Sequence, residues 1–458
     1  MYQYKGEDNT IAAVITPAGI GGVGVVRVSG ADAAGVIGRI FTGKTEGHPS
    51  AWHPYSLHYG WVRADNGDII DEVLVSWMPG PKSYTCEDVA EISGHGGPAV
   101  VGTILARCLQ AGARLAEPGE FTKRAFLNGR IDLAQAEAVL DIISARTEAA
   151  VRAVERQLKG DLSAELEALR GALLGVLGGI EATLNFPEED TDAGQAVKAA
   201  QEMEVIEGRL AALIATAPRG RILKEGIRVV ICGKPNVGKS SLLNALLRAP
   251  RAIVTDVAGT TRDVIEECVN IDGIPVNLVD TAGILVPRDK VEEEAVRRSR
   301  SAIASADIIL CVFDQSSPPD DTDRALMAET AHPRRIMVLN KSDLPSAEGH
   351  DVVGVCVRVS ALAREGVDAL RAAMVRMAAG DAPAEARGVL VNDARHLQAL
   401  QAAREALERA KATASNGNPL EFAAEDIKAA VNALDAITGR HVDDDVIEHI
   451  FSKFCIGK

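Results

Sequence analysis

Residues 233–240 read GKPNVGKS. This octapeptide matches the Walker A pattern of phosphate-binding loops in full. An apolar stretch at 227–231 precedes it as a predicted strand, and residues 241–247 follow it as a predicted helix. In such a strand–loop–helix unit, backbone N–H groups and the helix N-terminus hold phosphate. The stretch therefore predicts a nucleotide-binding α/β domain.

Two groups of side chains around this loop predict how phosphate and Mg²⁺ are held. Lys239 is expected to reach the β- and γ-phosphates, and the Ser240 hydroxyl is expected to bind Mg²⁺. A predicted strand at 276–279 ends in the sequence DTAG, in which Asp280 would hold Mg²⁺ through water and the Gly283 N–H would meet the γ-phosphate. Residues 259–263, GTTRD, are the candidate first switch, with Thr261 as the second Mg²⁺ ligand.

The identity of the base is predicted by two further strand ends. Residues 340–343, NKSD, follow a predicted strand at 336–339, and the Asp343 carboxylate can accept both N1–H and N2–H of guanine. Residues 360–362, SAL, follow a predicted strand at 355–359 and would offer a backbone N–H to guanine O6. Four such elements in this order indicate a GTPase. Ile284 follows Gly283 where Ras-like GTPases carry a glutamine, so the group that orients water must come from elsewhere.

The composition of the whole chain excludes several classes. Its 458 residues suggest about three domains. The net charge of -15 and the aromatic content of 3% argue against a general nucleic-acid-binding surface. Seven scattered cysteines without C-x-x-C spacing predict neither a disulfide framework nor a zinc site. The first nine residues lack the pattern of a secretory signal, and the longest strongly apolar run, 308–313, is too short for a membrane span. We therefore expect a cytoplasmic protein with no membrane partner.

The pattern of periodicity divides the chain into four segments. Residues 1–121 alternate predicted strands at 10–16, 23–28 and 69–77 with predicted helices at 31–41 and 98–111, which indicates an α+β domain. Apolar residues at helical spacing dominate 122–220 and return in 381–458, whereas 221–380 alternates strands and helices. Each helical segment alone has too few helices to bury its apolar stripes. We therefore predict one helical domain into which the α/β domain is inserted.

A resemblance to a known family becomes visible at this point. The Walker loop with Asn236, the switch at 259–263 and the terminal sequence FCIGK at 454–458 closely resemble the MnmE (TrmE) family of tRNA modification GTPases. The stretches at 23–30, 92–97 and 119–128 are similar to that family as well. The resemblance runs essentially from end to end, and the terminal tetrapeptide at 455–458 is its most specific mark.

The resemblance implies a fold and an activity. It implies an N-terminal folate-binding domain that forms a homodimer, and a helical domain with an inserted Ras-like P-loop G domain. It further implies a K⁺-dependent GTPase that works with the flavoprotein MnmG (GidA) in a heterotetramer. The pair would add a carboxymethylaminomethyl or aminomethyl group to carbon 5 of the wobble uridine of certain tRNAs. The one-carbon unit would come from 5,10-methylene-tetrahydrofolate, or from 5-formyl-tetrahydrofolate as its analogue.

The resemblance also implies roles for individual residues. The nucleotide site would comprise Asn236, Val237, Gly238, Lys239, Ser240, Ser241, Thr255, Asp256, Val257, Ala258, Gly259, Thr260, Thr261, Asp280, Thr281, Ala282, Gly283, Asn340, Lys341, Asp343, Ser360 and Ala361. The K⁺ ligands would be Asn236, Thr255, Val257 and Thr260, and the folate contacts Arg27, Glu91, Arg130 and Lys458. Two residues would be catalytic: Glu292, with Glu293 and Glu294 as neighbouring alternatives, would orient the hydrolytic water, and Cys455, the family's terminal cysteine, is the second candidate.

Two alternatives were weighed against this interpretation. A GTP-switch assembly factor for ribosomes would share all the G-domain motifs, but such proteins typically add an RNA-binding module with a basic surface, which a net charge of -15 does not favour. The stretch at 19–24, GIGGVG, matches the dinucleotide-binding pattern G-x-G-x-x-G. That pattern must open a helix, whereas the β-branched residues that follow predict a strand.

Overall fold

The fold is described from a computed structural model of the chain. The description covers residues 9–44, 47–185, 192–247, 266–280, 297, 299–349, 354–379, 388–416 and 418–458. The chain forms two compact units. One comprises Met1–Leu140, Leu158–Ile206 and Ala402–Lys458, and the other comprises Asp141–Gln157 and Glu207–Gln401. Among the described helices, none is both long and apolar enough to cross a membrane.

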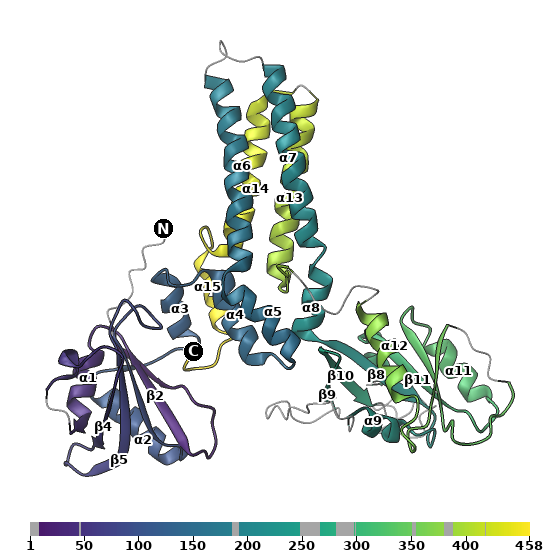
Figure 1. The fold of residues 1–458 in the computed structure, drawn as a ribbon, viewed down its shortest axis with the longest axis horizontal. Coiled ribbons are helices and arrows are strands. Elements are labelled where there is room, and N and C mark those ends of the chain that lie inside the picture. The colour runs from purple at the N-terminus through teal and green to yellow at the C-terminus, as the bar shows by residue number, and fades with distance from the viewer. Residues whose placement is uncertain are drawn as a thin grey trace. The chain divides into compact units, whose positions relative to one another are not determined.

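A seven-stranded sheet forms the N-terminal domain (Figure 1). Its strand order is β3-β4-β5-β6-β2-β1-β7, and all neighbours are antiparallel except β1 and β7. The strands are β1 (Ile11–Val14), β2 (Val23–Ser29), β3 (Phe41–Gly43), β4 (Ser56–Arg63), β5 (Ile69–Met78), β6 (Val89–His95) and β7 (Arg114–Leu115). Helices α1 (Ala33–Ile40) and α2 (Pro98–Gln110) pack on one face over a core that includes Val26, Ile37 and Ile104. The predicted α+β class is confirmed.

Two features of this sheet bear on the sequence predictions. Residues 23–29 form a strand and not a helix, so the glycine-rich stretch before them is no dinucleotide-binding loop. Strand β4 was not predicted from the sequence, because Gly60 interrupts its alternation of apolar and polar residues. A Cβ atom at Gly60 would lie 2.3 Å from the Thr42 carbonyl oxygen, so the close approach of β3 requires glycine there.

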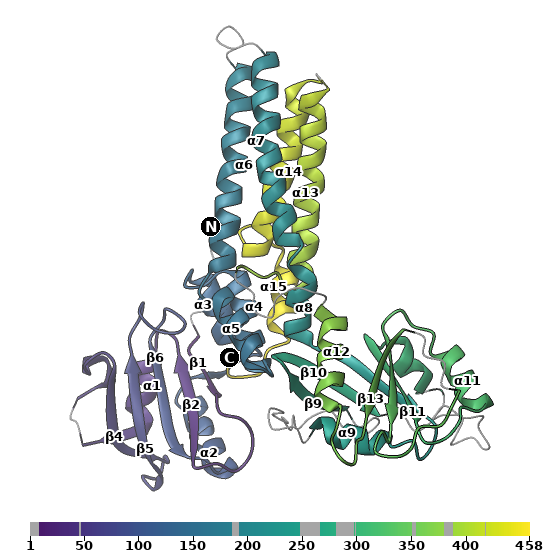
Figure 2. The same ribbon diagram turned by 45° about the vertical axis from the view of Figure 1, so that its right-hand side comes forward.

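Nine helices of the described chain belong to the two predicted helical segments. They are α3 (Glu120–Leu127), α4 (Leu133–Ser144), α5 (Glu148–Leu158), α6 (Asp161–Asn185), α7 (Asp192–Ile214), α8 (Ala217–Glu225), α13 (Ala394–Ser415), α14 (Leu420–Thr438) and α15 (Asp444–Phe451). Helix α6 packs along α14 in a bundle of long helices (Figure 2). Between these two helices, Arg170 forms an ion pair with the buried Asp435 at 2.7 Å. Since α6 precedes the inserted domain in the sequence and α14 follows it, the prediction of one interrupted helical domain is confirmed.

The inserted domain is a six-stranded sheet of order β13-β12-β11-β8-β10-β9. Its strands are β8 (Ile227–Gly233), β9 (Glu266–Ile271), β10 (Ile274–Asp280), β11 (Ile308–Asp314), β12 (Arg335–Asn340) and β13 (Val355–Val359), all parallel except β9. Helices α9 (Lys239–Leu247) and α12 (Val367–Ala379) cover one face, and α11 (Asp321–Glu329) lies on the other. Alternate residues of β8 therefore enter two separate cores.

The two segments through which the chain enters and leaves this domain lie against each other. The Thr216 hydroxyl accepts a hydrogen bond from the Val391 N–H at 3.0 Å, beside the start of α8. Lys224 at the end of α8 forms ion pairs with Asp393, at 2.9 Å, and with Asp141, at 3.0 Å. Termini held side by side are what an inserted domain requires.

Candidate functional site

The phosphate-binding loop lies at the carboxyl end of β8. The Lys239 ammonium donates to the carbonyl oxygens of Gly233 and Lys234 at 3.0 and 2.9 Å, so its position is set by the loop's own backbone. The Ser240 hydroxyl donates to Asp280 Oδ2 at 3.3 Å, which joins the loop to the end of β10. The two side chains predicted to hold Mg²⁺ from this face are therefore adjacent.

The carboxylate of Asp280 has the character of a cation ligand. Its Oδ1 atom is buried and has no hydrogen-bond partner in the described part of the chain. Burial raises the pKa of Asp280, an effect that Lys239 and Ser240 oppose. Burial likewise lowers the pKa of Lys239, against the opposing effect of Asp280. A hard divalent cation prefers oxygen ligands and stabilises the charged carboxylate, so Ser240 and Asp280 fit Mg²⁺.

The predicted base-recognition residues converge on Asn340, which is almost fully buried. Its Nδ2 atom donates to the Val237 carbonyl at 2.8 Å, and its Oδ1 accepts from the Ala361 N–H at 3.0 Å. Asn340 thus joins the phosphate loop to the segment after β13. A Cβ atom at Gly238 would lie 2.3 Å from Asn340 Nδ2, and Gly238 has a φ of 95°, so this position requires glycine.

Asp343 and Ser360 meet beside this junction. The Ser360 hydroxyl donates to Asp343 Oδ1 at 2.5 Å and accepts from the Ala363 N–H at 3.0 Å. Lys341, at a φ of 64°, forms an ion pair with Asp314 at 2.6 Å. The sequences NKSD and SAL therefore form one contiguous surface at the carboxyl edge of the sheet.

Three acidic residues near this edge were missed in the sequence. Asp314 ends β11; burial alone would raise its pKa, but its interactions with Lys341 and Ser316 together outweigh burial and lower the pKa. The rule that ligands bind at the carboxyl ends of parallel strands could have identified it. Lys234 is held by Asp320 at 2.9 Å and by Asp323 at 2.6 Å, and the hydrogen bond from Lys234 lowers the pKa of Asp320 to about 2. No short sequence pattern marks that contact.

Several predicted site residues lie outside the described part of the chain. They are the switch and K⁺ residues Thr255, Asp256, Val257, Ala258, Gly259, Thr260 and Thr261, the residues Thr281, Ala282 and Gly283, and Glu292 with its neighbours. Asn236 is described: it is exposed in the phosphate loop with a φ of 64°. Ser241 follows on the exposed side of α9.

A second cluster of predicted residues lies on the N-terminal domain. Arg27 on β2 forms an ion pair with Glu91 on β6 at 2.8 Å, across a directly paired position of the two strands. The Arg27 guanidinium lies 4.9 Å from the ring centre of Tyr84 and 5.4 Å from that of Phe121. Arg130 lies 4.8 Å from the Tyr84 ring and donates to the Tyr84 carbonyl. Two of the four predicted folate contacts, Arg27 and Arg130, thus lie against one tyrosine, and a third, Glu91, is paired with Arg27.

The terminal segment 455–458 completes this cluster. Its backbone pairs with the start of α3: the Phe121 N–H donates to the Lys458 carbonyl at 3.2 Å, and Ile456 forms an antiparallel bridge with Pro118. Gly457 has a φ of 101°, and a Cβ atom there would lie 2.3 Å from the Val14 carbonyl. The fourth predicted contact, Lys458, therefore lies beside Phe121. Cys455 presents an exposed side chain in the same segment.

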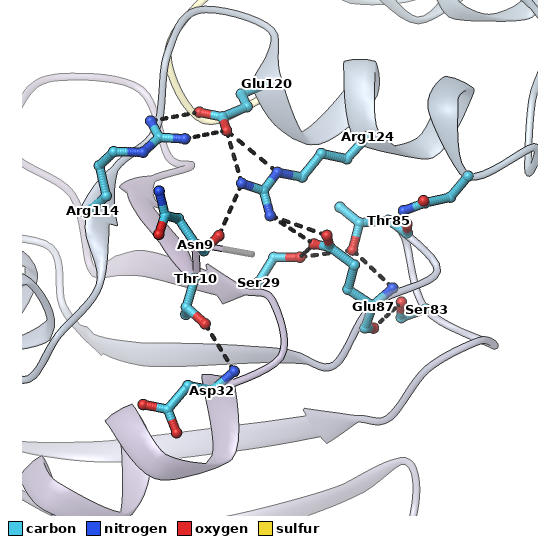
Figure 3. A network of polar contacts seen from close by, with 11 residues as sticks. Asn9, Thr10, Ser29, Asp32, Ser83, Thr85, Glu87, Arg114, Glu120 and Arg124 are labelled. Carbon is cyan, nitrogen blue, oxygen red and sulfur yellow. Dashed lines mark hydrogen bonds and ion pairs between the residues drawn. The ribbon is translucent and has the colours of Figure 1, made fainter. Parts of the chain in front are cut away.

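A network of charged residues supports the side of the cluster that Tyr84 and Phe121 form (Figure 3). Arg124 on α3 binds both oxygens of Glu87, at 3.0 and 3.1 Å, and binds Glu120 at 2.9 Å. Glu120 also accepts two hydrogen bonds from Arg114, and Glu87 accepts one from Ser29. The network connects the loop that holds Tyr84 to the helix that holds Phe121. Sequence reasoning missed all four charged residues, because neither their spacing nor their type is distinctive.

Comparison with known proteins gives matches along the whole chain. A family model described as the MnmE helical domain matches residues 133–455, and one described as the GTP-binding protein TrmE N-terminus matches residues 10–130. The tRNA modification GTPase MnmE of Roseiflexus sp. (strain RS-1) is 47% identical, over 98% of this chain and 99% of that protein. Its counterpart from Lacticaseibacillus paracasei is 43% identical, over 98% of each. Among solved structures, Era of Aquifex aeolicus bound to GDP and AlF4⁻ is 28% identical over 39% of this chain and 66% of that chain, with a TM-score of 0.29.

These matches distinguish between the two classes of GTPase considered from the sequence. They extend through the N-terminal and helical domains, for which an assembly factor that shares only the G domain would not account. The motifs for phosphate, Mg²⁺ and guanine lie together at one edge of the inserted sheet. The chain belongs to the MnmE (TrmE) family and is a tRNA modification GTPase.

Proposed function

We propose that this GTPase is K⁺-dependent and works with the flavoprotein MnmG to add an aminomethyl-type group to carbon 5 of the wobble uridine of certain tRNAs, with tetrahydrofolate as the one-carbon source. One observation carries the folate part of this proposal. The Nη1 atom of Arg27 is buried in the N-terminal cluster and has no hydrogen-bond partner in the described part of the chain. A buried guanidinium nitrogen without a partner is costly unless a ligand supplies an acceptor.

The chemistry of the cluster fits a folate. The Glu91 carboxylate is acceptor-only and suits the N–H groups of a pterin ring, and Arg27 and Arg130 suit oxygen acceptors and carboxylates. The Tyr84 ring, between two guanidinium groups, adds an aromatic surface. When bound, the folate would supply the one-carbon unit. Arg27, Glu91, Arg130 and Lys458 would hold and orient it.

The open face of the N-terminal sheet supports the proposed homodimer. Tyr59 on β4 and Leu74 on β5 are a directly paired position, and their residues are 37% and 40% exposed. Leu57, on the same face of β4, is 61% exposed. A group of large apolar side chains on an otherwise exposed sheet face is typical of a protein interface. A second copy of this chain is the occupant that the family resemblance favours.

The proposed modification is tested by mass spectrometry of nucleosides from tRNA. A strain without this gene should lose the modified wobble uridine, and the intact gene should restore it. The Cys455→Ser variant should retain GTP turnover but restore the modification poorly, because Cys455 lies outside the nucleotide site. An unchanged nucleoside profile in the deletion strain would refute the proposal, and full restoration by Cys455→Ser would leave Cys455 a structural role.

Loss of the terminal dipeptide is expected to weaken folate binding. Truncation after Ile456 removes the Lys458 carbonyl that holds Phe121 and the close contact of Gly457 with Val14. We expect calorimetry with 5-formyl-tetrahydrofolate to show at least about tenfold weaker binding, since one or two hydrogen bonds near a charged ligand are lost. GTP affinity should not change. Lys453→Ala, which removes an exposed lysine just before the terminal segment, is the matched control, and equal folate affinity in the truncated chain would contradict the placement.

Guanine recognition is tested by Asp343→Asn. The amide would present a donor toward guanine N1–H and N2–H, and two mispaired polar groups should weaken GTP binding by about a hundredfold. The same amide suits the extra carbonyl of xanthine, so affinity for xanthosine triphosphate should rise. Titration of both nucleotides into one variant supplies the internal control. GTP affinity that is unchanged in Asp343→Asn would remove this residue from the base site.

The dependence on K⁺ is tested through Asn236. A cage of neutral oxygens favours a large, weakly hydrated cation, and such a cation can take the role of an arginine finger. We expect hydrolysis at least about tenfold faster in K⁺ than in Na⁺ at equal ionic strength. Asn236→Ala should lose this difference. Asn236→Gly is the cleaner variant, because glycine keeps the positive φ of this position without the side-chain oxygen. Equal rates in the two salts for the unaltered chain would exclude a role for the cation. They would favour Arg262, the arginine of the candidate switch at 259–263, as an arginine finger.

A further inference from the structure

Two cysteines face each other beneath the phosphate loop. Cys232 on β8 and Cys311 on β11 are a directly paired position of two parallel neighbouring strands. Their Sγ atoms lie 3.6 Å apart, and both residues are fully buried in the core that also holds Phe313 and Leu339. Cys311 Sγ also lies 3.1 Å from the Thr330 hydroxyl. The nucleotide site described above uses neither thiol.

The backbone geometry at this position is that of a possible disulfide. Neighbouring strands lie about 4.7–4.9 Å apart, and disulfides span Cα distances of about 4.4–6.8 Å. Both side chains already point to the same face of the sheet, so the sulfur atoms can bond once the thiols rotate and the two strands move slightly closer together. In the described part of the chain, none of the remaining cysteines has a second thiol in contact; these are Cys86, Cys108, Cys268, Cys356 and Cys455.

We propose that Cys232 and Cys311 form a reversible disulfide with a small peroxide-class oxidant, and that this bond weakens the binding of GTP. One sulfur attacks the peroxide, which releases water and leaves a sulfenic acid. The second thiol then displaces the hydroxyl of that sulfenic acid as a second water. Two thiols and one hydrogen peroxide thus give one disulfide and two water molecules. A dithiol reductant restores both thiols by exchange.

The burial of the pair limits which oxidants can react. The hydrogen bond between the two thiols, together with burial, raises the pKa of Cys232, and the same hydrogen bond lowers the pKa of Cys311. Because both residues are fully buried, oxidation should be slow and should require local opening of the sheet. A small neutral molecule can enter such an opening, whereas a bulky peptide disulfide cannot. The pair therefore responds to peroxide and resists exchange with glutathione disulfide.

A disulfide between Cys232 and Cys311 would act directly on the phosphate loop. Gly233 follows Cys232 and is paired with Val312, which follows Cys311. A Cβ atom at Gly233 would lie only 2.6 Å from the Val312 carbonyl oxygen, so β8 and β11 are already packed closely at this position. The Gly233 carbonyl is one of the two acceptors that position Lys239. Drawing Cys232 toward β11 therefore displaces the first residue of the loop and the lysine that it holds.

The test treats the full-length chain with hydrogen peroxide and then alkylates the remaining thiols in denaturant. Peptide mass spectrometry should find a 232–311 crosslink that is two hydrogen atoms lighter than the separate thiol peptides. Affinity for a fluorescent GTP analogue should fall at least tenfold and should recover with dithiothreitol. Cys311→Ala should bind the analogue normally and lose the response to peroxide. Cys356→Ala, in which the half-buried cysteine of β13 is removed, should keep that response.

Three results would overturn the proposal. The first is a 232–311 peptide that stays unlinked while exposed thiols such as Cys455 are oxidised. The second is a quantitative crosslink that leaves nucleotide affinity unchanged. The third is an equal loss of affinity in the peroxide-treated Cys311→Ala variant, which would assign the effect to another thiol. Unaltered nucleotide binding by the reduced variant shows that it is folded.

Discussion

Replacing Lys239 by alanine is expected to lower the turnover of GTP by about 10²–10³-fold, the usual effect of removing one group that stabilises developing charge in a transition state. The Gly233 and Lys234 carbonyls hold the ammonium group at the carboxyl end of β8, so little reorganisation is required when phosphate binds. The site is half-buried, which strengthens the interaction of this charge with phosphate. Turnover at saturating GTP, together with the affinity for a fluorescent analogue, measures the effect.

The neighbouring lysine of the same loop supplies a matched control. Lys234 forms ion pairs with Asp320 and Asp323, so its charge is already neutralised within the protein. Lys234→Ala should change turnover by no more than a few-fold. Lys239→Arg keeps the charge but not the compact ammonium geometry and should remain strongly impaired. Equal losses in Lys234→Ala and Lys239→Ala would show that the loop responds to any loss of charge.

Replacing Arg124 by methionine is expected to destabilise the N-terminal domain by about 3–5 kcal/mol, because it removes the arginine that the half-buried Glu87 shares with the buried Glu120 and leaves Glu120 paired with Arg114 alone. The side chains of Arg124 and Glu120 are only 6% and 8% exposed. All three tryptophans of the chain, Trp52, Trp61 and Trp77, lie in this domain. Tryptophan fluorescence during urea denaturation therefore reports the unfolding of this domain alone.

The control for this variant is an exposed ion pair of the same domain. Arg39 pairs with Asp32 at 2.9 Å, with side chains 53% and 57% exposed, so Arg39→Met should cost less than about 1 kcal/mol. If Arg124→Met unfolds at the same urea concentration as Arg39→Met, the buried network does not stabilise the domain.

The same network predicts a dependence of stability on pH. Burial alone would raise the pKa of Glu120, but its hydrogen bonds from Arg114, the Glu117 N–H and Arg124 outweigh burial and lower it below its ordinary value of 4.5. A lowered pKa in the folded state contributes stability above the ordinary value, and that stability is lost as the pH falls through the folded pKa. The urea concentration at the unfolding midpoint should therefore decrease as the pH falls below about 4.5. This decrease should be less steep in the Glu120→Gln variant than in the unaltered chain.

The meeting of the described nucleotide-site motifs at one edge of the sheet was predictable because the information for each motif is local. The GKPNVGKS loop, Asp280 and the NKSD sequence each follow an apolar strand, and parallel strands bring their carboxyl ends to one edge. The two interrupted helical segments were predictable for a similar reason, because amphipathic periodicity is visible within each segment. Small errors remain within the segment 122–220, for which helical spacing was predicted: the helix is broken after Ser144, and Ile143 and Val151 are exposed.

Contacts between distant residues could not be predicted in this way. The pairing of Arg124 with Glu87, the meeting of Cys232 with Cys311 and the approach of β3 to Gly60 depend on strand register and loop path. Strand register and the path of a loop leave no local pattern in the sequence. The position of Lys458 beside Phe121 was expected only through the family resemblance, since four terminal residues have no periodicity of their own.

The docking of residues 455–458 on α3 has a consequence for how the protein is made. Translation delivers the N-terminal sheet and Phe121 well before Lys458, whose carbonyl accepts the hydrogen bond of the Phe121 N–H. At about 5–20 residues per second, the intervening chain takes on the order of 20–70 s to synthesise. During that interval the first domain can fold around its own core, but the cluster around Tyr84 and Phe121 stays incomplete. The proposed folate site is therefore completed only after residues 455–458 have been synthesised and have docked on α3.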